Sequence, residues 1–296
     1  MRISLALPDA YRAQDALSFH ARDPEGAAEQ VHGQLIRKGV MIDGVPVLIE
    51  VLLEAQAGQA ACTVHADGTL THHRLQQVRA ALRSMLGLRI DPAPFLEAVA
   101  DDPLLGALVH AQAGLRVIQS ASIFEALSWA IIGQQINLPF AIALRRTYIE
   151  QAGRRHSSGL RCYPTPQDAA HIDLEALTSR KFSRSKAATL QRLAVLVDSG
   201  SLDLDRDADI AAISRQLLAI KGIGPWTVNY ALLRGFGYPD CSLHGDVAIR
   251  TALQRLLGEA AKPDMARTEA LLGQYAPHRT MACAHLWASL SNPALP

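Results

Sequence analysis

The sequence predicts a mainly α-helical protein with an α+β antiparallel-sheet domain over residues 1–88. Two patterns support this fold class. Before residue 74, β-branched residues surround Asp-Gly pairs, which is typical of hairpins. After residue 74, apolar residues recur every three or four positions, as on the buried face of a helix. The length of 296 residues suggests two or more domains at roughly 100–200 residues each.

The N-terminal domain contains two Asp-Gly signals. The run GVMIDGVPVLIEVLLEA places Asp43-Gly44 between two apolar stretches and predicts a hairpin. The run ACTVHADGTLTHH predicts a further strand and a turn at Asp67-Gly68. Residues 24–39 fit either a helix or a strand, because their periodicity favours neither.

Three later segments have the apolar spacing of amphipathic helices: residues 73–88, 122–136 and 183–200. The last of them begins at Ser183, a favourable N-cap, and ends at Gly200, a residue that often terminates helices. No internal repeat of roughly 20–50 residues is visible, so the helical part is not predicted to be a repeat array.

The charge of the chain is close to neutral. Lys and Arg total 29, Asp and Glu total 28, and the pI is about 7.8. A domain with a dedicated basic surface often has a pI above ~9, so the composition alone does not indicate nucleic acid binding. Residues 154–192 are rich in Arg and Lys, and without other evidence an ordinary solvated helical surface is the favoured interpretation.

The four cysteines are far apart in the sequence: Cys62, Cys162, Cys241 and Cys283. Without a C-x-x-C pair they predict no zinc ribbon, and reduced thiols fit a cytoplasmic protein. His65, His72 and His73 lack a carboxylate with ligand spacing, so we expect solvated side chains and no metal site. We expect neither a signal peptide nor a membrane segment, since no apolar run approaches ~18 residues.

The most informative stretch begins with a predicted helix from about Asp209 to Ile220. Gly222 and Gly224 follow, and Pro225 suits the first turn of a second helix. Two closely spaced glycines leave the backbone amides of residues 222–227 uncovered at a helix N-terminus, which together form a site suited to a phosphate. On the Gly-x-Gly pattern alone, a plain helical hairpin is the favoured interpretation.

Trp226 and Tyr230 are four residues apart and therefore share one face of the second helix. Packing in the core is the usual role of such a pair, and a wall of an aromatic pocket is the alternative. Asp246 begins a further helix, where capping is a complete structural explanation. A carboxylate at the mouth of a pocket is compatible with that role, because the helix dipole favours negative charge there.

These segments resemble the helix–hairpin–helix DNA glycosylases, and within them the bacterial 3-methyladenine DNA glycosylase II (AlkA) type. The resemblance is carried by LLAIKGIGPWTVNYALLRGFG, SLHGDVAI, IIGQQINLPFA, CAHLWAS and, near the start, LSFHARD. It covers nearly the whole chain. It implies two helical domains after residues 1–88: residues 114–232 with the hairpin, and residues 89–113 with 233–296, which carry a catalytic aspartate.

The resemblance also implies roles for individual residues. It implies a DNA-binding role for Gly222, Ile223, Gly224, Trp226, Thr227 and Gln135. The first three belong to the hairpin whose amides grip a phosphate, often with a monovalent cation at the hairpin backbone, and Gln135 matches the residue that wedges into the duplex. It implies a base pocket lined by Trp226, Tyr230, Trp287 and Phe19. Asp246 matches the catalytic aspartate, and no cofactor is implied.

One position in the resemblance bears on the reaction type. Bifunctional members carry a lysine two residues after the second hairpin glycine, and this chain has Trp226 there. The resemblance therefore implies a monofunctional glycosylase that excises alkylated purines from double-stranded damaged DNA and leaves an abasic site. We expect it to act as a monomer. Gly245 and Val247 replace an acidic residue and a tyrosine of some relatives, which leaves the lesion range open.

Two alternatives remain from the sequence. A glycosylase for oxidised or deaminated bases would share the fold. A non-catalytic helix–hairpin–helix DNA-binding protein would keep the hairpin but would have no need for Asp246 together with the aromatic residues.

Overall fold

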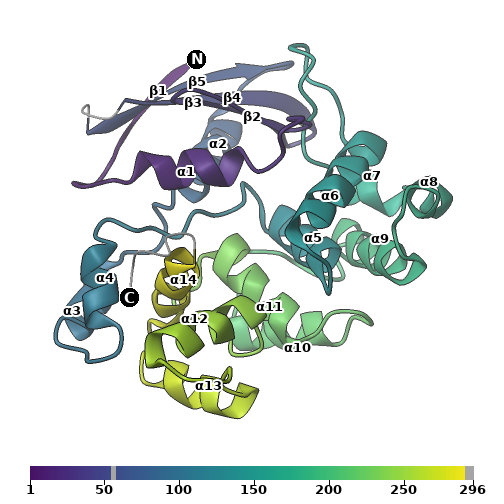
Figure 1. Ribbon diagram of the computed structural model, residues 1–296. Coiled ribbons are helices and arrows are strands. Elements are labelled where there is room, and N and C mark those ends of the chain that lie inside the picture. Colours follow the sequence, from purple (N-terminus) through teal and green to yellow (C-terminus); the bar gives the residue numbers. More distant parts are fainter. Residues whose placement is uncertain (55–57, 291–296) are drawn as a thin grey trace.

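The computed structural model describes residues 1–54 and 58–290. Its N-terminal part is a five-stranded antiparallel sheet in the order β1-β5-β4-β3-β2. The strands are β1 (Arg2–Ala6), β2 (Glu29–His32), β3 (Leu35–Ile42), β4 (Val45–Leu53) and β5 (Gln59–Ala66). Helices α1 (Ala13–His20) and α2 (His72–Met85) lie between this sheet and the rest of the molecule (Figure 1).

The hairpin predicted at Asp43-Gly44 is confirmed and joins β3 to β4. Both turn residues have positive φ, 46° and 72°, as the tight turns that suit twisted strands require. Residues 24–39, which fitted two structures, contain β2 and the start of β3. Asp67-Gly68 forms a bend after β5, and the chain then enters α2, which is capped by Thr71.

The inner face of the sheet packs on α2. Ile36, Val47 and Ile49 alternate along β3 and β4 and share a buried cluster with Val78 and Leu82 of α2. This alternation is the pattern of a sheet with one face buried. It gives the N-terminal part a hydrophobic core of its own.

All three predicted amphipathic helices are present, as α2, α5 and α9. The helices before and after the glycines Gly222 and Gly224 are α5 (Ile123–Gly133), α6 (Leu138–Ala152), α7 (Pro166–Ala170), α8 (Leu174–Thr178), α9 (Arg184–Asp198), α10 (Ile210–Leu218) and α11 (Pro225–Ala231). A π-helical turn, η1 (Leu232–Phe236), continues α11. The Ser183 hydroxyl caps α9 by accepting from the Lys186 amide, and Gly200 after its end has φ of 73°.

The remaining helices are α3 (Ala93–Ala98), α4 (Gly106–Ala111), α12 (Val247–Leu257), α13 (Met265–Gly273) and α14 (Arg279–Ser289). Helix α14 packs against α4, α12 and α13, which brings residues far apart in the sequence side by side (Figure 1). One continuous hydrophobic cluster runs through all these helices. No described helix is long and apolar enough to cross a membrane.

A buried ion cluster joins the sheet to the helices. Lys38 of β3 donates to Glu29 of β2 and, at 2.8 Å, to Glu125 of α5. Arg145 of α6 donates to the same two carboxylates, at 3.1 and 2.8 Å. Burial raises the pKa of Glu29, but Lys38 and Arg145 outweigh it and hold that pKa well below its ordinary value. The two cations and two anions therefore balance within the interface.

Replacing Lys38 tests how strongly this cluster holds the two parts together. Lys38→Met leaves two buried carboxylates facing one cation, so we expect a loss of about 3–5 kcal/mol in the free energy of unfolding. Arg37→Met is the matched control on the same strand, because Arg37 pairs with the half-exposed Glu50. It should cost less than about 1 kcal/mol. Equal losses in urea titrations of the two variants would contradict a stabilising role for the cluster.

Candidate active site

The predicted helix–hairpin–helix is present between α10 and α11. The Asp209 carboxylate caps α10 by accepting from the Ala211 amide at 3.0 Å, and the helix ends at Leu218. Gly222 has φ of 99°, a conformation that L side chains rarely adopt. Pro225 occupies the first turn of α11, where a missing N–H costs nothing.

The hairpin is held from two sides. A Cβ on Gly222 would lie 2.2 Å from Oγ1 of Thr189, so glycine permits the close approach to α9. Thr189 Oγ1 donates to the Lys221 carbonyl at 3.2 Å. From the end of α5, the side-chain amide of Gln134 donates to the Gly222 carbonyl at 3.0 Å and to Thr227 Oγ1 at 2.9 Å. These contacts fix the hairpin before any ligand binds.

The backbone amides of the hairpin are not all free, which corrects the expectation for residues 222–227. The Ile223 amide donates to the Ile220 carbonyl at 3.0 Å, and its side chain is buried. The amides of Gly222 and Gly224 donate to no acceptor among the described residues. Those of Trp226 and Thr227 lie in the first turn of α11, where helical amides have no partner within the helix. These four amides lie at the positive end of the helix dipole and can hold one phosphate.

Asp246 caps α12 and also binds two tryptophans. Its Oδ1 accepts from the Ala248 and Ile249 amides at 2.8 and 3.0 Å, as the capping prediction requires. The indole N–H of Trp226 donates to Oδ2 at 2.8 Å, and that of Trp287 donates to Oδ1 at 3.2 Å. Four donors from three helices therefore fix the orientation of this half-buried carboxylate.

The aromatic residues form one group beside Asp246. The ring centroids of Trp226 and Tyr230 are 5.2 Å apart, and those of Tyr230 and Trp287 are 6.2 Å apart. Tyr230 is buried in the core, whereas Trp226 and Trp287 are only partly buried and pack against it. The two interpretations of the Trp226–Tyr230 pair are therefore both partly right, with Tyr230 in the core and the indoles at its edge.

Phe19 reaches this group from α1 of the sheet part. The guanidinium carbon of Arg234 lies 5.1 Å from the Phe19 ring centroid and 5.4 Å from that of Trp287. Arg22 lies over Phe19 as well, at 3.8 Å. Sequence reasoning missed both arginines, although Arg234 continues the four-residue spacing of Trp226 and Tyr230 along one helical face.

Gln135 lies in the connection between α5 and α6. Its side chain is exposed and its φ is 55°, a left-handed conformation that is strained for a residue other than glycine. Lys186 Nζ, at the start of α9, donates to the Ile132 and Gln134 carbonyls at 2.8 and 2.6 Å and anchors the end of α5. Gln135 thus directly follows the residue whose side chain contacts the hairpin.

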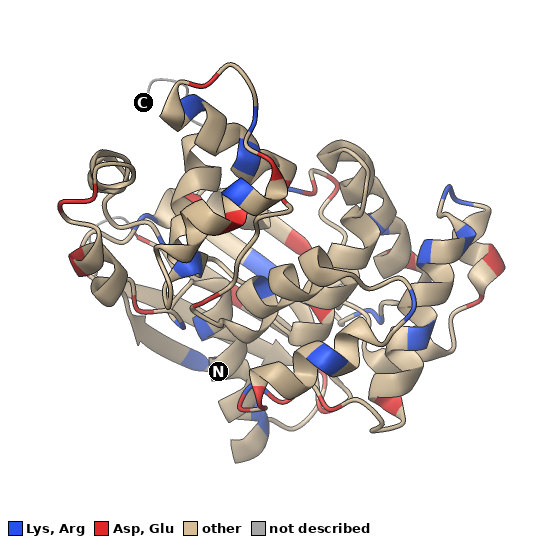
Figure 2. Ribbon diagram, turned by 90° about the horizontal axis from the view of Figure 1, so that it is seen from below, with Lys and Arg blue, Asp and Glu red and all other residues tan. Residues whose placement is uncertain are grey.

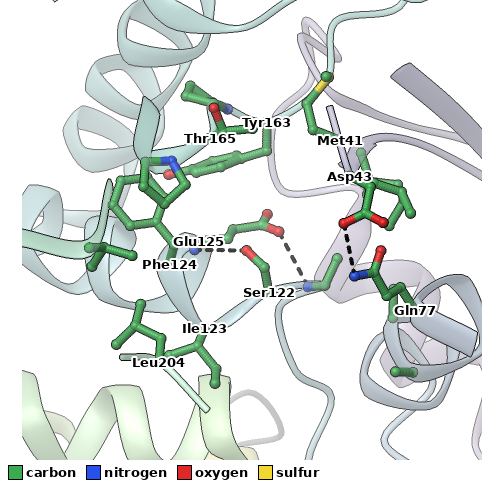
Figure 3. Close-up of a pocket in the computed structure, with 18 of the residues that line it drawn as sticks. Met41, Asp43, Gln77, Ser122, Ile123, Phe124, Glu125, Tyr163, Thr165 and Leu204 are labelled. Atoms are coloured by element: carbon green, nitrogen blue, oxygen red, sulfur yellow. Dashed lines mark hydrogen bonds between the residues drawn. The ribbon is translucent and has the colours of Figure 1, made fainter. Parts of the chain in front are cut away.

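A cavity between the sheet and the helices lies elsewhere in the molecule. It measures about 380 Å³ and is lined by Met41, Tyr163 and Leu204 among others, between the sheet and the helices (Figure 3). Its lining includes neither Asp246 nor the aromatic group. No cluster of three or more metal-binding side chains occurs in the described part of the chain. His65 contacts Glu50 and His73 contacts Asp43, at separate places.

The four cysteines are free and buried. Burial raises the pKa of the Cys62 thiol and of the Cys162 thiol to about 11, so these thiols are protonated and unreactive near neutral pH. The charged residues of both signs are interspersed over the ribbon (Figure 2), in keeping with the near-neutral composition.

Comparison with known proteins identifies the family of the chain. Residues 128–278 match the family described as HhH-GPD superfamily base excision DNA repair protein. The chain belongs to this superfamily. Residues 2–122 match the AlkA N-terminal domain, so the expected family and fold class are both confirmed for this HhH-GPD protein.

Relatives span most of the chain. A DNA-3-methyladenine glycosylase of Bacillus subtilis is 25% identical over 293 residues, which is 97% of each chain. DNA-3-methyladenine glycosylase 2 of Escherichia coli is 32% identical over 189 residues, covering 62% of this chain and 63% of that protein. The structure of a 3-methyladenine DNA-glycosylase from Archaeoglobus fulgidus superposes with a TM-score of 0.84 at 20% identity, covering 99% of this chain and 100% of that one.

Substituting the two hairpin glycines with alanine should affect the stability of the protein to different extents. Gly222→Ala forces a Cβ into Thr189 and into a left-handed backbone, and we expect a loss of about 1–3 kcal/mol in the free energy of unfolding. Gly224→Ala meets open space at φ of −113° and should cost less than about 1 kcal/mol. Urea titration of both variants measures the difference. A larger loss of stability in Gly224→Ala than in Gly222→Ala would contradict the close packing of Gly222 on Thr189.

Proposed function

We propose that this protein is a monofunctional DNA glycosylase that excises alkylated purines, such as 3-methyladenine and 7-methylguanine, from double-stranded DNA. The reaction hydrolyses the N-glycosidic bond and leaves an abasic site for base excision repair. The observation that carries the proposal is the carboxylate of Asp246, fixed by the indoles of Trp226 and Trp287 at the edge of an aromatic group. The relatives named DNA-3-methyladenine glycosylase support the choice of alkylated purines.

Access to the bond requires that the nucleotide leave the duplex. The free amides of Gly222, Gly224, Trp226 and Thr227 hold a backbone phosphate, which keeps the strand in place while the base turns outward. The exposed Gln135 fills the space that the base leaves. A grip through amides needs no basic surface, so a net charge of +1 is compatible with DNA binding.

The extruded base then lies against the aromatic group. Alkylated purines such as 3-methyladenine carry a positive charge, and the electron-rich faces of Trp226 and Trp287 favour such a ring by about 0.5–2 kcal/mol. A base that is already cationic needs no acid to protonate it as it leaves. The site therefore needs no general acid for this class of base, and the aromatic faces serve to bind it.

Asp246 acts on the sugar. As the glycosidic bond breaks, positive charge develops on the deoxyribose ring, and a fixed carboxylate nearby stabilises it. The same carboxylate can position or deprotonate the attacking water. Trp226 stands where bifunctional relatives carry lysine, so the side chain offers no amine to form a Schiff base with the sugar.

A non-catalytic DNA-binding protein fits less well. Such a protein needs the hairpin but gains nothing from orienting a half-buried carboxylate with two indoles.

The central test is release of free base. The purified protein should release 3-methyladenine from methylated duplex DNA, and Asp246→Asn should lower the single-turnover rate by at least about 100-fold. Asparagine still caps α12, so the fold is preserved. Asp209→Asn, a cap on α10 away from the aromatic group, is the control and should keep the wild-type rate. Failure of the wild-type protein to release any base overturns the proposal.

Strand chemistry provides an independent check. Borohydride reduction during turnover should trap no covalent complex between the protein and DNA, because Trp226 cannot form an imine. A bifunctional relative treated in parallel supplies the positive control. A trapped adduct would show that another amine attacks the sugar and that the enzyme is not monofunctional.

The hydrogen bonds from the indoles to Asp246 should affect the rate of the reaction. Trp226→Phe keeps a ring against Tyr230 but removes the donor to Oδ2, so the carboxylate is held less firmly. We expect kcat to fall about tenfold, as for loss of one hydrogen bond to a charged group. KM should change less, since the ring face remains. An unchanged kcat would mean that the backbone amides alone orient Asp246.

A further inference from the structure

A surface of positive charge runs along α9 and the segment before it. Residues 176–197 contain no Asp or Glu, and their basic side chains form what is here named the α9 surface: Arg180, Lys181, Arg184, Lys186 and Arg192. All of these are exposed except Lys186, which is half-buried. None forms a salt bridge with a carboxylate of residues 1–54 or 58–290. In Figure 2 several blue segments lie on the helices at the right of the view, where α8 and α9 lie in Figure 1.

The α9 surface is joined to the hairpin by direct contacts. Arg192 donates to the Lys221 carbonyl at 3.1 Å, and Lys221 directly precedes Gly222. Lys186 donates through Nζ to the Gln134 carbonyl at 2.6 Å, while the Gln134 side chain donates to the Gly222 carbonyl at 3.0 Å. Cations of this surface therefore contact the hairpin itself and the residue that holds it.

The stability of α9 does not explain where these cations lie. Arg184 is the first residue of the helix and Lys186 is the third, and the positive end of the helix dipole disfavours cations there. Lys181, just before the helix, has φ of 72°, which is strained for a residue other than glycine. An ordinary solvated surface, the interpretation that the sequence alone favours, accounts for neither feature. An anion is favoured at the same place both by the dipole and by the exposed cations.

The spread of the cations suits a long anion. Arg184 and Arg192 are eight residues apart, which is about 12 Å along the helix. One strand of duplex DNA carries a phosphate for each ~3.4 Å of its axis, so this length corresponds to about three or four phosphates. A small anion would need the cations to converge on one point. A nucleic acid backbone can use cations spread along a helix.

We propose that the α9 surface binds the backbone of the DNA duplex outside the damaged nucleotide, on one side of it. The inference rests on the proposed glycosylase function and adds to it a contact with undamaged duplex. The hairpin amides hold one phosphate, and the α9 surface holds further phosphates beside it. Such contacts read no base edge, so they strengthen binding to every duplex alike and support the search for damage along intact DNA.

The test removes two exposed cations of the α9 surface. The double variant combines Lys181→Asn, since asparagine tolerates a left-handed backbone, with Arg184→Gln. The matched control combines Arg2→Gln with Arg79→Gln, which removes the same charge from exposed residues of β1 and α2. The probe is an undamaged duplex that extends past the protein on both sides. Its Kd is measured at several salt concentrations between about 50 and 200 mM.

We expect the double variant to depend less on salt than the wild-type protein. The slope of the logarithm of the association constant against the logarithm of salt concentration should shrink by about 1–2, because each lost phosphate contact removes about 0.9. Its Kd at the lowest salt concentration should rise about tenfold. Each single substitution should give about half of the change in slope. The control should keep the slope within about 0.5 of wild type.

A second measurement locates the contact. Two duplexes carry a stable abasic-site analogue, and each is cut to about two base pairs on one side of it, the 5′ side in one and the 3′ side in the other; this is shorter than the stretch that the α9 surface spans. The hairpin affects both proteins alike, so the comparison is between them. The ratio of the two Kd values should be larger for the wild-type protein than for the double variant, by about threefold or more.

The outcomes separate this inference from the function on which it rests. An unchanged slope in a folded double variant overturns the inference, whether or not the protein releases bases. An equal reduction in the control also overturns it, because net charge and not the α9 surface would then be responsible. If the wild-type protein releases no alkylated base, the proposed function fails, while the duplex measurements still decide this inference. If circular dichroism shows that the double variant does not fold, the two single variants decide it.

Discussion

The carboxylate of Asp246 connects α11, α12 and α14, and the candidate chemistry depends on that connection. Its Oδ1 accepts from the first-turn amides of α12, which fixes the helix start, while the indoles of Trp226 and Trp287 reach it from the other two helices. A carboxylate with four donors keeps its orientation without help from substrate. Under the proposed function each tryptophan has two roles at once, because its ring face would contact the extruded base while its N–H holds the carboxylate of Asp246.

The sheet part is needed for the same site. It contributes Phe19 and Arg22 at the end of α1, and it is held to α5 and α6 by the buried cluster of Lys38, Glu29, Glu125 and Arg145. Ion pairs of this kind add little stability compared with apolar packing, but breaking one is costly, so they permit only one arrangement of the two parts. The position of Phe19 relative to Asp246 therefore depends on ion pairs between residues 87 and 116 positions apart in the chain.

Local signals in the sequence predicted much of this fold and less of the site. The Asp43-Gly44 turn, the Ser183 cap and the Gly222 bend are determined by neighbouring residues, and each is present. Bonds between the indoles and Asp246 span 20 and 41 positions, and no periodicity encodes them. The sequence could not show which hairpin amides are free either, because the hydrogen bond from the Ile223 amide to the Ile220 carbonyl depends on the exact path of the backbone. Phe19 and Arg234 meet only through tertiary packing.

Near-neutral composition hides an uneven distribution of charge in space. Most buried charges in the interface between sheet and helices are paired, so they contribute no field at a distance. Arg22 and Arg234 form no salt bridge among the described residues and lie against aromatic rings, while Asp246 accepts from the indoles of Trp226 and Trp287. These charges without an ion-pair partner therefore lie at the aromatic group, the place where the proposed function puts the extruded nucleotide.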